Sequence, residues 1–125
     1  MEGMPIVVAT MFVVAGVIHL LPVVGVIGGS QLQRMYGVEL CSPAVVLLMR
    51  HRALLFAGLA LLLVGAAFEP SWRIPAVTSG LLGAAGFIVL ASGKSLDEPL
   101  RRVVRADWIA VAALVIAAIG TALGA

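Results

Sequence analysis

Four long apolar stretches restrict this 125-residue chain more than any other feature. They cover residues 5–27, 43–68, 74–92 and 107–125. Each has roughly the 17–25 residues that a helix needs to cross the hydrocarbon of a bilayer. In lipid such segments become helices, because a helix satisfies its own backbone hydrogen bonds. The sequence therefore predicts an all-α integral membrane protein, a single-domain four-helix bundle with up-down-up-down topology.

The overall composition agrees with a membrane environment. Hydrophobic residues make up 62% of the chain, charged residues make up 11%, and the mean hydropathy is +1.18. An average soluble domain is about 45–50% apolar and about 25% charged. The net charge is only +2 and no basic stripe is interleaved with aromatic residues, so we expect no nucleic-acid partner.

Residues that start or stop helices lie at the ends of these stretches. Ser42 precedes Pro43, which is the order of an N-cap and a proline in the first helical turn. Glu69-Pro70 follows the second stretch, and Gly93 follows the third. Pro22 lies inside the first stretch, where a proline without an amide hydrogen predicts a kink.

Basic residues are concentrated on one side of the predicted bundle. The first and third connections, with the adjoining helix ends, carry Arg34, Arg50, Arg52, Lys94, Arg101, Arg102 and Arg105. The other side carries only Arg73, together with Glu2 and Glu69. Short loops rich in Lys and Arg stay in the cytoplasm. We therefore predict a multi-pass protein of the inner (cell) membrane with both termini on the non-cytoplasmic side.

The third connection contains a second membrane signal. Asp97-Glu98 precedes Pro99 and predicts a solvated turn. The turn opens a short basic segment, Leu100 to Arg105, whose composition suits the membrane surface.

Small residues recur at helical spacing in the last two stretches. The third has Ser79, Gly80, Gly83 and Gly86, and the fourth has Ala106, Ala110, Ala113, Ala117 and Gly120. Small side chains let helices approach closely in lipid, so these residues predict packing seams. Such seams fit helices within one chain, a homo-oligomer or a membrane-protein partner.

Ionisable side chains of three stretches fall at one depth. With a rise of 1.5 Å per residue, His19 lies about 21 Å from Pro5, and His51 lies about 25 Å from Phe68. Asp107 lies about 25 Å from the far end of its own stretch. Arg50 and Arg52 flank His51, and three successive residues spread over roughly 200° of a helix surface. At least one of those three side chains should therefore point between helices.

This polar layer has two main interpretations. In the first, Asp107 forms a structural ion pair with Arg50 or Arg52, because a charge inside a membrane needs a partner. In the second, the layer binds the polar head of a lipid or another small amphiphile. The candidate binding residues are His19, Arg50, His51, Arg52 and Asp107, with Tyr36 and Glu39 at the mouth of the site. Two histidines at one depth also allow haem ligation.

Motifs of familiar enzymes are missing from the sequence. There is no G-x-x-x-x-G-K-[ST] phosphate loop, no G-x-S-x-G elbow and no H-E-x-x-H zinc motif. Cys41 is the single cysteine, and two distant histidines do not complete a zinc pattern. We therefore expect no catalytic residues, no metal and no resident cofactor, with haem or quinone as the alternative.

Four segments resemble a known group of proteins. They are Gly16-Val-Ile-His-Leu-Leu-Pro22-Val-Val-Gly25, Met35-Tyr-Gly37, Met49-Arg-His-Arg-Ala53 and Arg102-Val-Val-Arg-Ala-Asp107. Together they resemble an uncharacterised family of small bacterial four-helix membrane proteins, often labelled phosphopantetheine adenylyltransferase. The soluble enzyme of that name has a nucleotide-binding α/β fold with a histidine-containing phosphate motif, and this chain has neither. We therefore do not expect adenylyltransferase activity.

The chain also resembles, more loosely, the DoxX-like membrane proteins, which share the four-helix plan and a Gly-x-x-His near the end of the first span. One branch of that group is linked to quinone-dependent sulfur oxidation. The functional prediction is therefore a small membrane protein that binds a lipid or another amphiphile at its cytoplasmic side. The alternatives are a membrane redox subunit that contacts quinone or haem, and a structural or assembly partner of a larger membrane complex.

Overall fold

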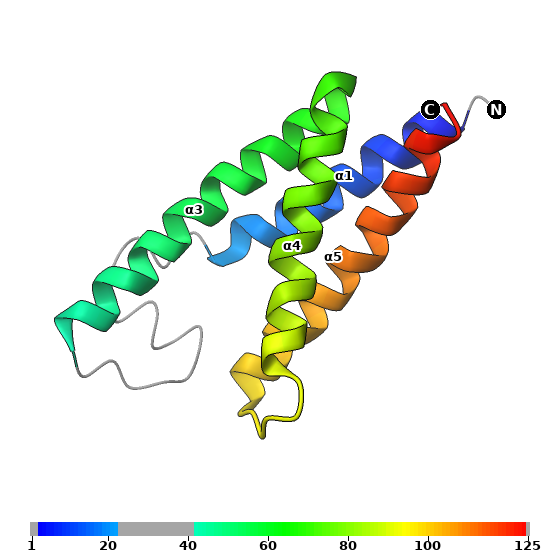
Figure 1. Ribbon diagram of the computed structural model, residues 1–125. Coiled ribbons are helices and arrows are strands. Elements are labelled where there is room, and N and C mark those ends of the chain that lie inside the picture. Colours follow the sequence, from blue (N-terminus) through cyan, green and yellow to red (C-terminus); the bar gives the residue numbers. More distant parts are fainter. Residues whose placement is uncertain (1–2, 23–41, 125) are drawn as a thin grey trace.

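The computed structural model describes residues 3–22 and 42–124, and all regular elements within these ranges are helical (Figure 1). This confirms the all-α bundle. Tyr36, Glu39 and the rest of residues 23–41 lie outside the described residues. The elements are α1 (Met4–Leu20), α3 (Pro43–Phe68), the 3-10 helix η2 (Pro70–Trp72), α4 (Arg73–Ala91) and α5 (Glu98–Ala122).

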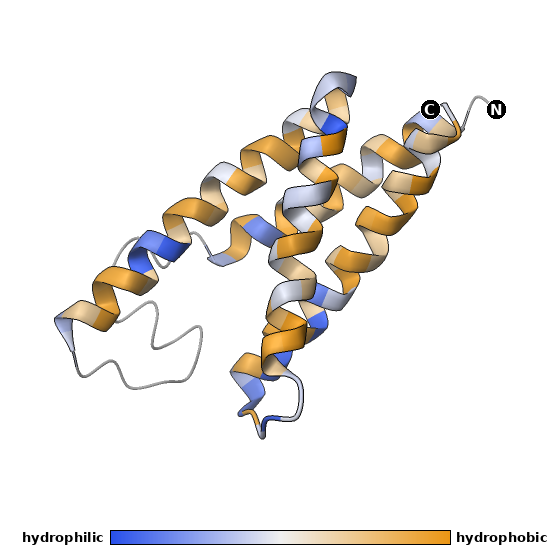
Figure 2. Cartoon of the chain, viewed as in Figure 1, coloured by the Kyte–Doolittle hydropathy of each residue, from blue (hydrophilic) through white to orange (hydrophobic). Residues whose placement is uncertain are grey.

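Three of the described helical segments are long and apolar enough to cross a membrane: α3, η2 with α4, and α5. The fourth, α1, is also apolar but has 17 residues. Large apolar side chains cover the outside, and Phe68, Leu61 and Leu82 are 80%, 74% and 76% exposed. Figure 2 shows that apolar residues predominate along every helix, interrupted by a few polar bands. A chain with this surface is a membrane protein.

The helices form a bundle in which consecutive helices run in opposite directions (Figure 1). Within it α1 packs against both α3 and α5, and α4 packs along α5. Helices α3 and α4 meet at η2 and then diverge. Met4 and Ala122 lie at the same end as η2, which we call the terminal end. The opposite end, where α3 and α5 begin and residues 92–97 connect α4 to α5, is called the basic end.

Small residues allow the helices to approach closely in the core. On α5 the buried positions are Ala110, Ala113, Leu114, Ala117 and Gly120, so four of the five small residues of the predicted seam are buried, and Ala106 is half-buried. Gly16 of α1 and Gly80 of α4 are also buried. A Cβ atom on Gly16 would lie 2.6 Å from Cγ2 of Val64. Gly86 differs, because a Cβ atom there meets nothing within 4 Å.

The predicted helix ends on α3 and α4 are confirmed. Ser42 is the N-cap of α3, and its Oγ accepts a hydrogen bond of 3.2 Å from the amide of Ala44. Gly93 follows α4 with φ +76°, a conformation that favours glycine. At the end of α1, the α-helix stops at Leu20, and Leu21 and Pro22 have 3-10 conformation. The predicted kink at Pro22 depends on residues 23–27, which lie outside the described residues.

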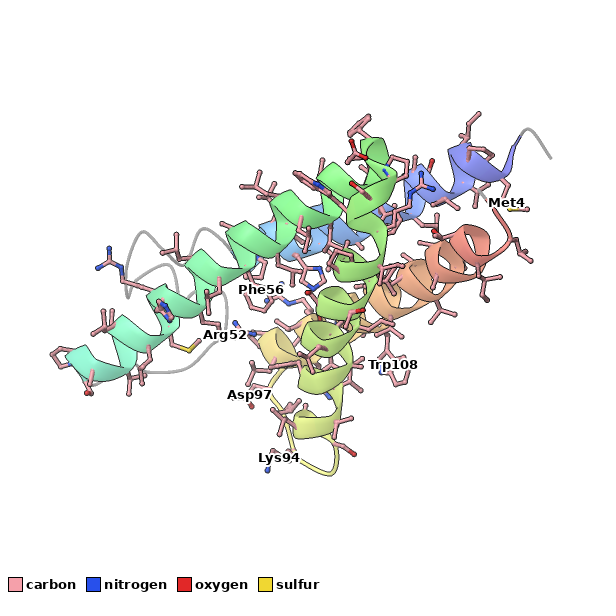
Figure 3. The ribbon with its side chains drawn as sticks, turned by 45° about the horizontal axis from the view of Figure 1, so that its top comes forward. Met4, Arg52, Phe56, Lys94, Asp97 and Trp108 are labelled. Atoms are coloured by element: carbon pink, nitrogen blue, oxygen red, sulfur yellow. The ribbon has the colours of Figure 1, made fainter. Side chains whose placement is uncertain are left out.

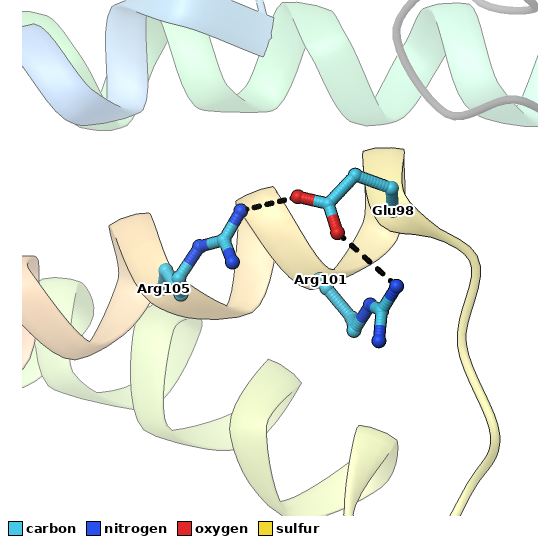
Figure 4. Close-up of polar contacts among 3 residues, drawn as sticks. All are labelled: Glu98, Arg101 and Arg105. Carbon is cyan, nitrogen blue, oxygen red and sulfur yellow. Dashed lines mark hydrogen bonds and ion pairs between the residues drawn. The ribbon is translucent and has the colours of Figure 1, made fainter.

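The start of α5 differs from the prediction. The helix begins at Glu98 and not at 107, so the basic segment from Leu100 to Arg105 is its first part. Pro99 occupies the first turn, where a missing amide hydrogen has no cost. Glu98 then forms ion pairs with Arg101 and Arg105 along the helix surface (Figure 4). The prediction was wrong because the apolar stretch ends where the hydrocarbon of the membrane ends, whereas the helix continues beyond that boundary.

Candidate functional site

Among the polar and charged side chains that the structure describes, His19 is the most deeply buried. It lies on α1 and is 2% exposed. Its Nδ1 is 2.8 Å from the carbonyl oxygen of Ala15. Because a carbonyl only accepts, Nδ1 carries the hydrogen, and Nε2 of the neutral ring is an acceptor. Among the described residues Nε2 has no hydrogen-bond partner, although it is buried.

Two other helices approach the free nitrogen of His19. The ring of Phe56 on α3 has its centroid 5.7 Å from the imidazole centroid, at an interplanar angle of 46°. On α4 the nearest position is Gly83, where an added Cβ atom would lie 3.9 Å from Nε2 and 3.5 Å from Cδ2 of Leu59. The absence of a side chain at Gly83 therefore leaves space for about one methyl group beside Nε2.

Arg52 links α3 to α4 next to this space. Its guanidinium carbon lies 4.5 Å from the ring centroid of Phe56 and 5.8 Å from that of Phe87. Figure 3 shows Arg52 beside Phe56, both reaching from α3 toward the interior of the bundle. Cation–π contacts of this kind hold a cation at an aromatic face without neutralising its charge.

Asp107 brings α5 to the same region. The side chain is half-buried and interacts electrostatically with Arg52. Residues of all four described helices thus converge: His19, Arg52 with Phe56, Gly83 with Phe87, and Asp107. We call His19, Arg52, Phe56, Phe87 and Asp107 the polar cluster. The ion pair between Asp107 and Arg52 stays a prediction, and Arg52 is the arginine that the geometry favours.

Other predicted site residues lie elsewhere. Arg50 and His51 are exposed on α3, so of the three successive residues Arg52 is the one that turns into the bundle. The two histidines therefore have different surroundings, because His19 is buried and His51 is not. Tyr36 and Glu39, the expected mouth of the site, lie outside the described residues. In the described ranges, no group of three or more His, Cys, Asp or Glu residues gathers in a way that could hold a metal ion.

Sequence reasoning missed two kinds of residue. Phe56 and Phe87 gave no signal, because an aromatic side chain is ordinary in an apolar helix. The one available hint was that Phe56 follows Arg52 by one helical turn.

At the terminal end, Arg73 is 7% exposed, and its Nε donates to the carbonyl oxygen of Ala66 at 3.3 Å. The only signal for Arg73 in the sequence was that it is the single basic residue on the predicted non-cytoplasmic side.

Comparison of the chain with protein-family models, with curated proteins and with solved structures found no match. The geometry of the polar cluster is therefore the basis on which a function is proposed, and the resemblances noted in the sequence stay hypotheses.

Proposed function

We propose that this protein binds the polar head of a lipid or another small amphiphile at the polar cluster. The observation that carries the proposal is Nε2 of His19, a buried acceptor without a hydrogen-bond partner among the described residues. Leaving such a group unsatisfied costs about 1–3 kcal/mol. A membrane protein that keeps an ionisable group in this state commonly uses it at a functional site.

The chemistry of the cluster specifies the head of the ligand. Nε2 of His19 accepts a hydrogen bond, so the ligand must supply a hydroxyl, a protonated acid or an N–H group. Arg52 lies against the same Phe56 ring as His19, and its positive charge favours a head that also carries an anionic oxygen or another acceptor. A hydroxylated or acidic head offers both kinds of group. Gly83 keeps side-chain atoms of α4 away from Nε2, where the head would lie.

The surroundings of the cluster favour an amphiphile over a water-soluble ligand. The outward faces of the neighbouring helices are apolar, and Leu55 of α3 and Leu82 of α4 are 61% and 76% exposed. A ligand that approaches through the bilayer along these faces needs an apolar tail. The charge bias of the connections further supports an inner-membrane topology with the basic end in the cytoplasm and both termini outside.

Native mass spectrometry of protein purified in mild detergent tests the proposal. We expect the wild-type protein to retain an amphiphile, which solvent extraction and mass analysis then identify. Gly83→Ala adds one methyl group beside Nε2 in ordinary van der Waals contact with Leu59, so the chain should fold and retain less ligand. Gly86→Ala is the matched control, because its methyl group meets nothing within 4 Å.

Four outcomes contradict amphiphile binding at this site. Equal retention by Gly83→Ala and Gly86→Ala would place the ligand elsewhere, and no retained molecule in the wild type would remove the basis of the proposal. A Soret band would favour the haem-binding alternative. If the extracted amphiphile is a quinone, the binding proposal holds and the protein acts as a membrane redox subunit. A co-purifying membrane protein, without a bound small molecule, would favour the assembly role.

A further inference from the structure

We propose that a groove between the end of α4 and the start of α5 is a separate binding site for an anionic phospholipid. The groove lies toward the basic end and has a volume of about 510 Å³. Lys94, Arg101 and Arg105 form its rim, and Ile88, Val104 and Trp108 form its wall. We call it the basic groove. It shares no residue with the polar cluster, and Figure 3 shows Arg52 and Trp108 on opposite sides of α4.

The charge of the rim suits one phosphodiester group. Glu98 forms ion pairs with Arg101, at 3.2 Å, and with Arg105, so it holds both guanidinium groups on one side of α5 (Figure 4). Each guanidinium has five N–H donors, so one carboxylate leaves donors for a second anion. With Lys94, the rim keeps two net positive charges. Arginine is well suited to phosphate because its planar fork can bind two oxygens.

The wall of the basic groove distinguishes a lipid from a free phosphate ion. Trp108 is 58% exposed, and tryptophan commonly lies at the boundary between head groups and hydrocarbon. Ile109 beside it is 57% exposed, and Leu90 on α4 is 74% exposed. The surface therefore changes from basic to apolar along the helices. An anionic head at the rim would place its acyl chains against this apolar surface, and basic pockets between transmembrane helices bind such lipids.

The test uses the full chain in a neutral detergent, with phosphatidylglycerol and phosphatidylcholine of identical acyl chains as probes. Native mass spectrometry measures how many of each lipid remain bound. We expect phosphatidylglycerol to be preferred, and Arg101→Gln and Arg105→Gln each to weaken its binding roughly fivefold. Both side chains are exposed, so their replacement should leave folding intact. Arg102→Gln is the matched control, since Arg102 is exposed on the same helix and does not line the groove.

A second readout reports on the groove itself. Trp72→Phe leaves Trp108 as the single tryptophan, because the chain has two. Phosphatidylglycerol with brominated acyl chains should then quench Trp108 fluorescence at lower lipid concentration than the brominated phosphatidylcholine does.

Equal effects of Arg101→Gln and Arg102→Gln would show that diffuse surface charge attracts the lipid and would overturn the site. Equal binding of the two lipids would do the same. Competition by glycerol phosphate at the concentrations at which the intact lipid binds would identify a free phosphate as the ligand and overturn the lipid proposal. Because none of these variants touches the polar cluster, retention of its amphiphile is judged separately.

Discussion

Gly16→Ala should destabilise the protein by separating α1 from α3. A Cβ atom at this position would lie 2.6 Å from Cγ2 of Val64, 3.3 Å from the amide nitrogen of Val64 and 3.4 Å from the carbonyl oxygen of Ala60. A side chain can rotate away from the first contact. The other two involve backbone, so relief requires the helices to move apart.

The magnitude follows from two opposing effects. Replacing glycine by alanine inside a helix stabilises it by about 0.5–1 kcal/mol. Inserting a methyl group into a well-packed core costs about 1–3 kcal/mol. At Gly58 of α3 nothing lies within 4 Å of the added atom, so only the first effect acts there. The free energy of unfolding should therefore be lower in Gly16→Ala than in Gly58→Ala by about 1–3 kcal/mol.

The assay is reversible unfolding in mixed micelles, followed by circular dichroism. Comparison of the two alanine variants removes the helix-propensity effect that they share. If Gly16→Ala is as stable as Gly58→Ala, the close approach of α1 and α3 at this glycine is wrong, and so is the placement of His19 one turn farther along α1.

Two further predictions concern charge. If Asp107 pairs with Arg52, Asp107→Asn and Arg52→Gln should be non-additive in a double-mutant cycle of unfolding free energies, with a coupling above about 1 kcal/mol because both side chains are partly buried. The same cycle with the exposed Arg50→Gln should give a coupling of less than about 0.5 kcal/mol. A larger coupling with Arg50 than with Arg52 would identify Arg50 as the partner of Asp107. For orientation, a reporter fused after Ala125 should lie outside the cytoplasm and one inserted at Gln33 inside it. Exchanged positions of the two reporters would refute the predicted topology.

Features that depend on local chemistry could be predicted from the sequence. Ser42 with Pro43 marks the start of α3, and Gly93 marks the turn after α4, because caps and left-handed turns require particular residues. The start of α5 could not be predicted in this way. Hydropathy falls at Asp107, whereas Pro99 and the Glu98 ion pairs extend the helix into the polar region.

The sequence predicts the depth of the candidate site in the membrane, but it does not predict how each helix is rotated about its axis. Counting along the helices brought His19, Asp107 and the Arg50 to Arg52 segment to one level. Which of the three successive residues turns inward depends on how α3 rotates against its neighbours, and in an apolar chain the hydrophobic pattern does not fix that rotation. For the same reason Gly83 and Gly86 were equivalent in the sequence, although only Gly83 faces His19.

The state of His19 tests the central claim most directly. The chain has two histidines, so His51→Gln leaves His19 as the only source of imidazole nitrogen signals. In protein purified with its amphiphile, the ¹⁵N spectrum should show Nδ1 carrying the hydrogen and Nε2 accepting a hydrogen bond. Extraction of the amphiphile should shift the Nε2 signal and leave the Nδ1 signal in place. A Nε2 signal that is the same before and after extraction would contradict ligand binding at His19.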